Sequence, residues 1–289
     1  MKKHKPIKFI AVLPSAITLL NGFFGISAIL IAGIGPGLRD HFPLISRINL
    51  SYLTISAWMI VLSMAADALD GSVARASGFS SDFGAQLDSL CDVVSFGVAP
   101  ALLSYKMFAS ELANLYGNEF RFSNLIGRWV LFCALFYALC ALVRLARFNV
   151  ETDANETSHM SFAGLPSPAA AGLIIGLVLF HEQFASSPVI RLSFPGSALP
   201  EVFRNVSLWS IPFALLITGL LMVSRVAYPH IVNYLLHRKR PFTVLVFVLF
   251  IGLFAIWNIN VSLLLGFLLF CVYGVILWLL KALRRSREK

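Results

Sequence analysis

The sequence predicts an all-α protein that crosses a membrane about eight times. Of its 289 residues, 58% are hydrophobic and only 13% are charged. A typical soluble domain has about 25% charged residues, so this chain lacks the polar surface that a soluble globule of its length needs. It also contains repeated apolar runs close to the roughly 20 residues that cross a bilayer as a helix. Soluble, disordered and collagen-like proteins are thereby excluded.

The first four predicted helices span residues 11–34, 51–69, 84–108 and 126–147. The first is almost wholly apolar and follows a lysine-rich start. The second and third carry acidic residues within an apolar stretch of spanning length. The fourth ends in arginines, and basic side chains are typical of the membrane interface. Because the connection between the second and third is short, we expect those two helices to be antiparallel neighbours.

The last four predicted helices span residues 165–182, 207–227, 241–257 and 260–280. Prolines stand at the start of the first of these, where proline suits the initial turn of a helix. The connection 183–206 is rich in Pro, Ser and Gly and is predicted to be irregular. Only three residues separate the last two helices, which predicts a tight helical hairpin.

The placement of the basic residues predicts the orientation. Lys and Arg number 23 against 14 Asp and Glu. They cluster at 1–9, at 237–240 (HRKR) and at 281–289. If both termini are cytoplasmic, the inner segments hold more than twice as many Lys and Arg residues as the outer ones, as the positive-inside rule requires. Such clusters suit anionic lipid headgroups, so we expect membrane lipids and no nucleic acid as partners.

Five of the acidic residues fall within 26 positions, and four of them form two spaced pairs. Asp67 and Asp70 are three apart near the end of the second predicted helix, and Asp88 and Asp92 are four apart at the start of the third. Residues at either spacing share a helix face. The two pairs can therefore face each other at one membrane depth.

Carboxylates gathered at membrane depth repel one another and lose their hydration, so something must neutralise them. Two divalent cations would balance four carboxylates, and ligands without His or Cys suit Mg²⁺ or Mn²⁺. Gly71 and Ala74 allow a ligand close to the helix backbone. Arg75 can bind a phosphate through paired hydrogen bonds, and Ser81 can donate another. The pattern indicates metal-assisted substitution at phosphorus.

Eight residues at fixed spacings make up the complete motif, which reads Asp67-x2-Asp70-Gly71-x2-Ala74-Arg75-x8-Gly84-x3-Asp88-x3-Asp92. At every position it resembles the signature of the CDP-alcohol phosphotransferase family. Four further segments resemble the phosphatidylserine synthase branch of that family: LPSAITLLNGFFG (13–25), SFGVAPA (95–101), RLARFN (144–149) and GLPSPAAAG (164–172).

The resemblance implies transfer of the phosphatidyl group from CDP-diacylglycerol to L-serine, giving phosphatidylserine and CMP. It implies an integral protein of a prokaryotic cytoplasmic membrane, with its active site on the cytoplasmic side, and a homodimer. We expect one domain over 1–289, with a family core of about six helices at 11–227 and an additional helical hairpin at 241–280.

The resemblance also implies roles for individual residues. Asp67, Asp70 and Asp88 would hold two metal ions, with Asp67 and Asp88 bridging both, and Asp92 would be a ligand and the general base. The family often has Pro-Asn where this chain has Pro14-Ser15, so nucleotide contacts in the first helix are assigned further along. The residues expected to contact CDP-diacylglycerol are Gly71, Ala74, Arg75, Ser81, Gly84, Thr18 and Asn21.

Arg144 and Arg147 are candidates for binding the acceptor. They are three apart on the fourth predicted helix, at the end where the aspartates are expected. A guanidinium group binds a carboxylate, such as that of serine, through two parallel hydrogen bonds. The alternative is that both arginines only anchor the helix at the membrane surface.

Two alternative functions remain open from the sequence. An enzyme of the same family could use another acceptor, such as glycerol 3-phosphate, inositol phosphate or choline. A cation transporter could instead use the intramembrane carboxylates as an ion path, although that would leave the spacing of the glycines and Arg75 without a reason.

Overall fold

The computed structural model describes residues 12–38, 50–77, 82–116, 125–154, 164–186, 199–226, 228 and 258–287. Within these ranges the regular elements are helical and no strand occurs. Seven of the helical segments are long and apolar enough to cross a membrane. The predicted all-α membrane fold is therefore confirmed, with seven of the eight predicted spans. The remaining one, 241–257, lies outside the described residues, and the orientation of the termini stays a prediction.

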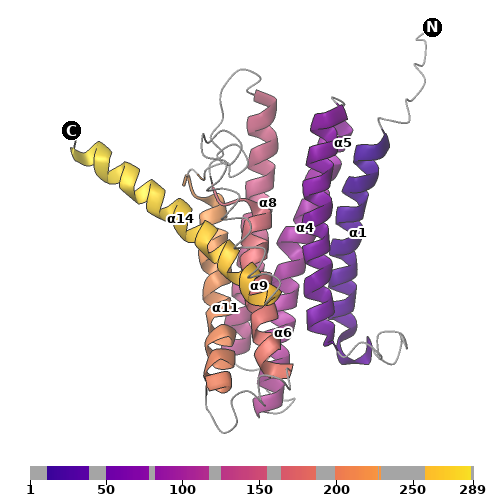
Figure 1. Ribbon diagram of the computed structural model, residues 1–289, viewed down its shortest axis with the longest axis vertical. Helices are drawn as coiled ribbons and strands as arrows, with labels where there is room; N and C mark the ends of the chain where they lie inside the picture. The colour runs from indigo at the N-terminus through magenta and orange to yellow at the C-terminus, as the bar shows by residue number, and fades with distance from the viewer. Residues whose placement is uncertain are drawn as a thin grey trace.

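Three N-terminal helices lie side by side and form one part of the bundle (Figure 1). They are α1 (Val12–Ile34), α4 (Tyr52–Ser77) and α5 (Asp82–Asp92), and α1 continues into the short 3₁₀ turn η2 (Gly35–Gly37). Helix α1 packs along α4 and also against α5. It thereby covers both helices that carry the aspartates.

Two glycines let α1 approach α5 and the π-helical turn that follows it (η3, Val93–Val98) closely. A Cβ added at Gly22 would lie 2.8 Å from Sγ of Cys91, and one at Gly25 would collide with the side chain and backbone of Ser95. Small residues at such contacts are typical of helix packing in membranes, where close backbone approach supplies much of the attraction. The close contact places the polar side chains of α1 against the acidic face of α5.

The predicted third helix is longer than expected and contains a π-helical turn. Helix α5 continues through η3 (Val93–Val98) into α6 (Ala99–Tyr116), and the N–H of Ala99 donates to the carbonyl of Val94. Pro100 explains the wider turn, because proline has no N–H and its ring clashes with the carbonyl four residues earlier. That carbonyl, of Phe96, instead accepts a hydrogen bond of 2.9 Å from the hydroxyl of Tyr137.

The second half of the bundle consists of α8 (Leu125–Ala154), α9 (Ser167–Ser186), α11 (Leu199–Val223) and α14 (Ile259–Arg287). Helix α11 packs against both α8 and α9, whereas α14 crosses the bundle obliquely and packs on α9 (Figure 1). Helix α9 begins between the two prolines, as predicted. Its residues are mostly buried, so α9 is the central helix of this half.

The predicted irregular connection 183–206 is wrong at both ends. Helix α9 continues to Ser186, and α11 begins at Leu199, eight residues before the predicted start of that span. Pro200 lies in the first turn, where proline is tolerated, and Glu201 places a negative charge at the helix N-terminus. The connection is rich in Pro, Ser and Gly, so these helix-start residues were interpreted as part of an irregular loop.

Candidate functional site

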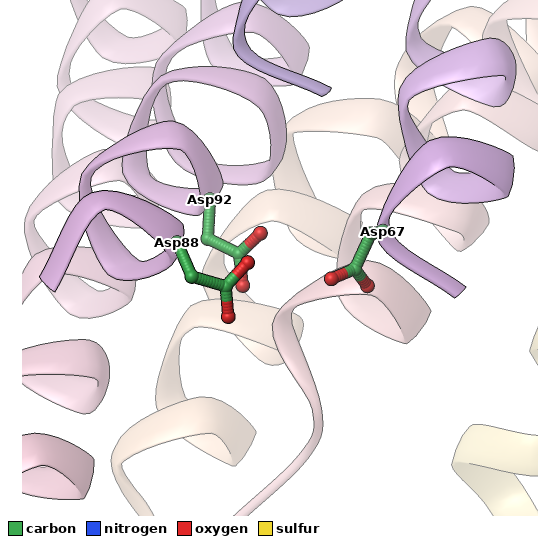
Figure 2. Close-up of side chains that lie close together, drawn as sticks. All are labelled: Asp67, Asp88 and Asp92. Carbon is green, nitrogen blue, oxygen red and sulfur yellow. The ribbon is translucent and has the colours of Figure 1, made fainter. Parts of the chain in front are cut away.

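The structure brings together three of the four predicted aspartates. Asp67 comes from α4, and Asp88 and Asp92 come from α5. One carboxylate oxygen from each lies within 4.8 Å of the others. Figure 2 shows the carboxylate of Asp67 facing the other two across the gap between the helices. These three residues are called the aspartate cluster below.

Asp70, the fourth predicted aspartate, is held by α1. The hydroxyl of Thr18 donates a hydrogen bond to its carboxylate, and both side chains are buried. The negative charge of Asp70 still acts on Asp67 and Asp88. Asp70 therefore adds to the charge at this place, although its oxygens do not belong to the group of three.

Asp92 is also fixed by α1. Nδ2 of Asn21 donates a hydrogen bond of 3.0 Å to Oδ1 of Asp92, and Asn21 is completely buried. The backbone carbonyl of Asn21 in turn accepts a hydrogen bond of 3.0 Å from the hydroxyl of Ser95. One oxygen of Asp92 is thus held in place by a neutral donor that does not cancel its charge.

Helix α8 contributes two polar contacts through the RLARFN segment. Asn149 accepts a hydrogen bond of 2.9 Å from Ser89, the neighbour of Asp88. Arg144 lies close enough to Asp92 for their charges to attract, and its Nη1 donates a hydrogen bond of 2.5 Å to the hydroxyl of Ser167. Arg147 is partly buried one turn further along.

Charge and donor type fit a divalent cation at the aspartate cluster. The nearby carboxylates carry more negative charge than Arg144 can offset, and such an excess is costly at membrane depth. The donor atoms are carboxylate oxygens, which hard cations such as Mg²⁺ and Mn²⁺ prefer. Among the residues that the structure describes, no His or Cys joins this group of oxygens.

The other residues predicted to contact the nucleotide lie around this cluster along the chain. Gly71 is partly buried in the last turns of α4, and Gly84 is partly buried in the first turn of α5. Ala74 and Arg75 belong to the end of α4. Ser81 lies outside the described residues. Their contacts with a substrate stay a prediction.

Sequence reasoning did not assign roles to Ser167, Asn149 or Ser95. Each lies in one of the segments singled out by resemblance, so a signal was present. Their contacts reach across 23, 60 and 74 residues respectively, and spacing within one helix cannot reveal such pairs.

A second buried polar group, called the distal cluster here, consists of Glu111, His181 and Arg204. Nη2 of Arg204 donates to Oε2 of Glu111 at 3.1 Å, and Nε2 of His181 lies 3.6 Å from Oε1. Glu111 belongs to the same continuous helix as Asp92, so the two clusters are roughly 30 Å apart at 1.5 Å per residue. The side chain of His181 is completely buried.

Comparisons with known proteins identify a family and several named relatives. A family model described as CDP-alcohol phosphatidyltransferase matches residues 11–218. A protein of Methanocaldococcus jannaschii named CDP-diacylglycerol–serine O-phosphatidyltransferase is 31% identical over 242 residues, which cover 83% of this chain and 92% of that protein. A Helicobacter pylori protein of the same name is 30% identical over 225 residues, covering 78% of this chain and 80% of its own.

A relative from Saccharomyces cerevisiae also carries that name. It is 37% identical over 166 residues, which cover 56% of this chain and 51% of the yeast protein. The family match covers most of the chain and includes every helix that contributes to the aspartate cluster and its hydrogen-bond partners. The chain belongs to the CDP-alcohol phosphatidyltransferase family.

Proposed function

We propose that this protein transfers the phosphatidyl group from CDP-diacylglycerol to L-serine and releases CMP. The observation that carries the proposal is the aspartate cluster, in which one carboxylate oxygen from each of three aspartates on two helices lies within 4.8 Å of the others. Its support comes from membership of the family and from relatives in an archaeon, a bacterium and a yeast that carry the same enzyme name.

Asp67, Asp88 and Asp92, with Asp70 beside them, would hold divalent cations, and we infer two ions of Mg²⁺ or Mn²⁺ from the charge balance. When bound, such ions draw electron density from a diphosphate and stabilise the charge on the departing phosphate. Thr18 and Asn21 would keep Asp70 and Asp92 in their rotamers. These two residues could thereby support the nucleotide site as well as contact it.

Asp92 would act as the general base. The serine hydroxyl oxygen forms a bond to the phosphorus that carries diacylglycerol, and the bond from that phosphorus to the CMP oxygen breaks. The proton of the hydroxyl passes to Asp92 as the new bond forms, so a weak base is sufficient. Asn21 keeps one oxygen of Asp92 oriented during this transfer.

Binding of the two substrates would be shared between the helix ends. We assign CDP-diacylglycerol to Gly71, Ala74, Arg75, Ser81 and Gly84, which border the aspartates along the chain. We assign the serine carboxylate to the arginines of α8, Arg144 and Arg147. Arg144 is the stronger candidate because its positive charge acts on Asp92, which must reach the serine hydroxyl.

We further infer an enzyme of a prokaryotic cytoplasmic membrane, with both termini and the active site on the cytoplasmic side, that acts as a homodimer. The excess of basic residues in the predicted inner segments supports the orientation. The single domain at 1–289, with its core at 11–227 and its hairpin at 241–280, is supported by a family match that ends at 218.

The decisive experiment offers the purified full chain CDP-diacylglycerol, Mg²⁺ or Mn²⁺, and one acceptor at a time in detergent. We expect metal-dependent CMP release coupled to formation of phosphatidylserine. Preferred use of glycerol 3-phosphate, inositol phosphate or choline would instead support another enzyme of the family. Cation movement across vesicles without any CMP release would support a transporter.

A further inference from the structure

The guanidinium group of Arg144 is fixed at one nitrogen and unpaired at another. Its Nη1 donates to Oγ of Ser167 at 2.5 Å, and Ser167 is completely buried at the start of α9. Its Nε is buried and has no hydrogen-bond partner among the described residues. Buried donors are nearly always paired in folded proteins, so this nitrogen is a candidate for a ligand contact.

The geometry of a guanidinium group explains why Nη1 can be bonded to the protein while Nε remains available for a ligand. Nε and Nη2 lie along one edge and together match the two oxygens of a carboxylate, whereas Nη1 lies outside that edge. The contact with Ser167 therefore occupies the nitrogen that a carboxylate on that edge does not use. It also prevents rotation of the group about its long side chain.

Ser167 stands on a rigid support. The N–H of Gly164 donates to the carbonyl of Val226 at 2.8 Å, and that of Leu165 donates to Leu221 at 3.0 Å. Gly164 has a φ of 97°, and a Cβ there would collide with the carbonyl of Met222. The chain before α9 is thus fixed to the end of α11, which holds the Ser167 hydroxyl in place.

We propose that Ser167 is a positioning residue for acceptor recognition. It holds Nη1 of Arg144 so that the Nε and Nη2 edge binds the carboxylate of an amino-acid acceptor next to Asp92. This inference rests on the proposed function and deepens it, because it explains how the site selects an acceptor that carries a carboxylate beside its hydroxyl.

The test compares the full-length parent with Ser167→Ala and Ser167→Cys in detergent, with L-serine and CDP-diacylglycerol varied in turn. We expect Ser167→Ala to raise the KM for L-serine about five- to tenfold, as for loss of one hydrogen bond. The KM for CDP-diacylglycerol and kcat should stay within about twofold. Ser167→Cys, which keeps the size of the side chain and a weak acceptor, should lie between the parent and the alanine variant.

Ser104→Ala is the matched control. Ser104 is equally buried, but its hydroxyl donates only to the carbonyl of Pro100 within its own helix. The same change in size and polarity there should leave both KM values unaltered. A rise in the KM for serine in this variant would show that the effect of Ser167→Ala reflects general loosening of the bundle, and would overturn the proposal.

A double-mutant cycle separates positioning from an independent effect. Because Ser167 acts through Arg144, adding Ser167→Ala to Arg144→Lys should change the KM for serine by less than twofold. Full multiplication of the two effects would overturn the proposal, as would a rise confined to the KM for CDP-diacylglycerol. Failure of the proposed function looks different, since the parent itself would then not form phosphatidylserine.

Discussion

The aspartate cluster and the distal cluster each include residues of the continuous helix α5–η3–α6, and they differ in how their charges are balanced. Glu111 in the distal cluster has Arg204 at 3.1 Å and His181 at 3.6 Å. Asp67, Asp88 and Asp92 instead face one another. Both groups place charged side chains in partly or fully buried positions, so burial alone does not mark a functional site. The aspartate cluster differs because its negative charges are not balanced by enough positive side chains of the protein.

The two groups also connect different helices. The distal cluster joins α6, α9 and α11, and Glu111 of α6 has a basic side chain from each of the other two helices beside it. The aspartate cluster joins α4 and α5 through groups that repel. The distal cluster can therefore stabilise the bundle without a ligand, whereas we expect the aspartate cluster to need a bound cation to become favourable.

The largest expected effect separates the clusters by activity. Asp88→Asn should lower turnover at least about 100-fold, because a cation ligand and its charge are lost together. Glu111→Gln, roughly 30 Å away, should leave turnover within about threefold. Both are measured as CMP release by variants matched for folded protein. Equal losses in the two variants would mean that the clusters are not functionally distinct.

Metal binding should raise the stability of the parent through the aspartate cluster. At a free ion concentration 100 times the Kd, a ligand that binds only the folded state adds about 2.7 kcal/mol. We expect Mg²⁺ or Mn²⁺ to raise the Tm of the parent and of Glu111→Gln, but not that of Asp67→Asn. The measurement is thermal unfolding in detergent with and without a chelator. A Tm of the parent that does not respond to either ion would contradict the assignment.

Removing the negative charge of Glu111 from the distal cluster should destabilise the protein. Glu111→Gln leaves Arg204 without its charged partner, which should cost about 1–3 kcal/mol in unfolding free energy. Adding Arg204→Met should recover part of this loss, because the uncompensated charge is then removed. The measurement is again thermal unfolding. If Arg204→Met lowers the unfolding free energy of Glu111→Gln as much as it lowers that of the parent, the two residues do not act as a pair.

A smaller effect is expected at the π-helical turn between the clusters. Tyr137→Phe removes the hydrogen bond to the carbonyl of Phe96 and leaves that buried acceptor unpaired, at a cost of about 1–3 kcal/mol. Turnover should fall only a fewfold, since Asp92 keeps its contact with Asn21. Cys133→Ala, on the same helix and equally buried, serves as the control for loss of core volume without loss of a hydrogen bond.

The spans and the pairing of the aspartates could be predicted because both depend on local periodicity. Apolar length defines the helices, and the i, i+4 spacing puts Asp88 and Asp92 on one face. The i, i+3 partner of Asp67, Asp70, lies outside the group of three. The contacts that support the site could not be predicted in this way. Asn21 and Asp92 are 71 residues apart, and their meeting depends on how α1 is rotated against α5.

The distal cluster was missed for a related reason. Glu111 and Arg204 are 93 residues apart, and each looks like an ordinary charge near the end of an apolar segment. Arg204 was also placed in an irregular connection, whereas it lies on the early turns of α11. Only the packing of α6, α9 and α11 shows that these side chains neutralise each other. A charge pattern within one segment contains no information about such compensation.

The π-helical turn η3 changes the rotational phase of the helix that carries Asp88 and Asp92 before it and Glu111 after it. A π turn accommodates one extra residue, and one residue corresponds to about 100° around an α-helix. The face that α5 presents therefore does not continue as the same stripe along α6. The rotation of α5 about the helix axis, which directs the aspartates, is therefore independent of the rotation of α6, which directs its packing side chains. Deleting one residue from Val93–Val98 would restore a regular α-helix there and would rotate α5 relative to α6.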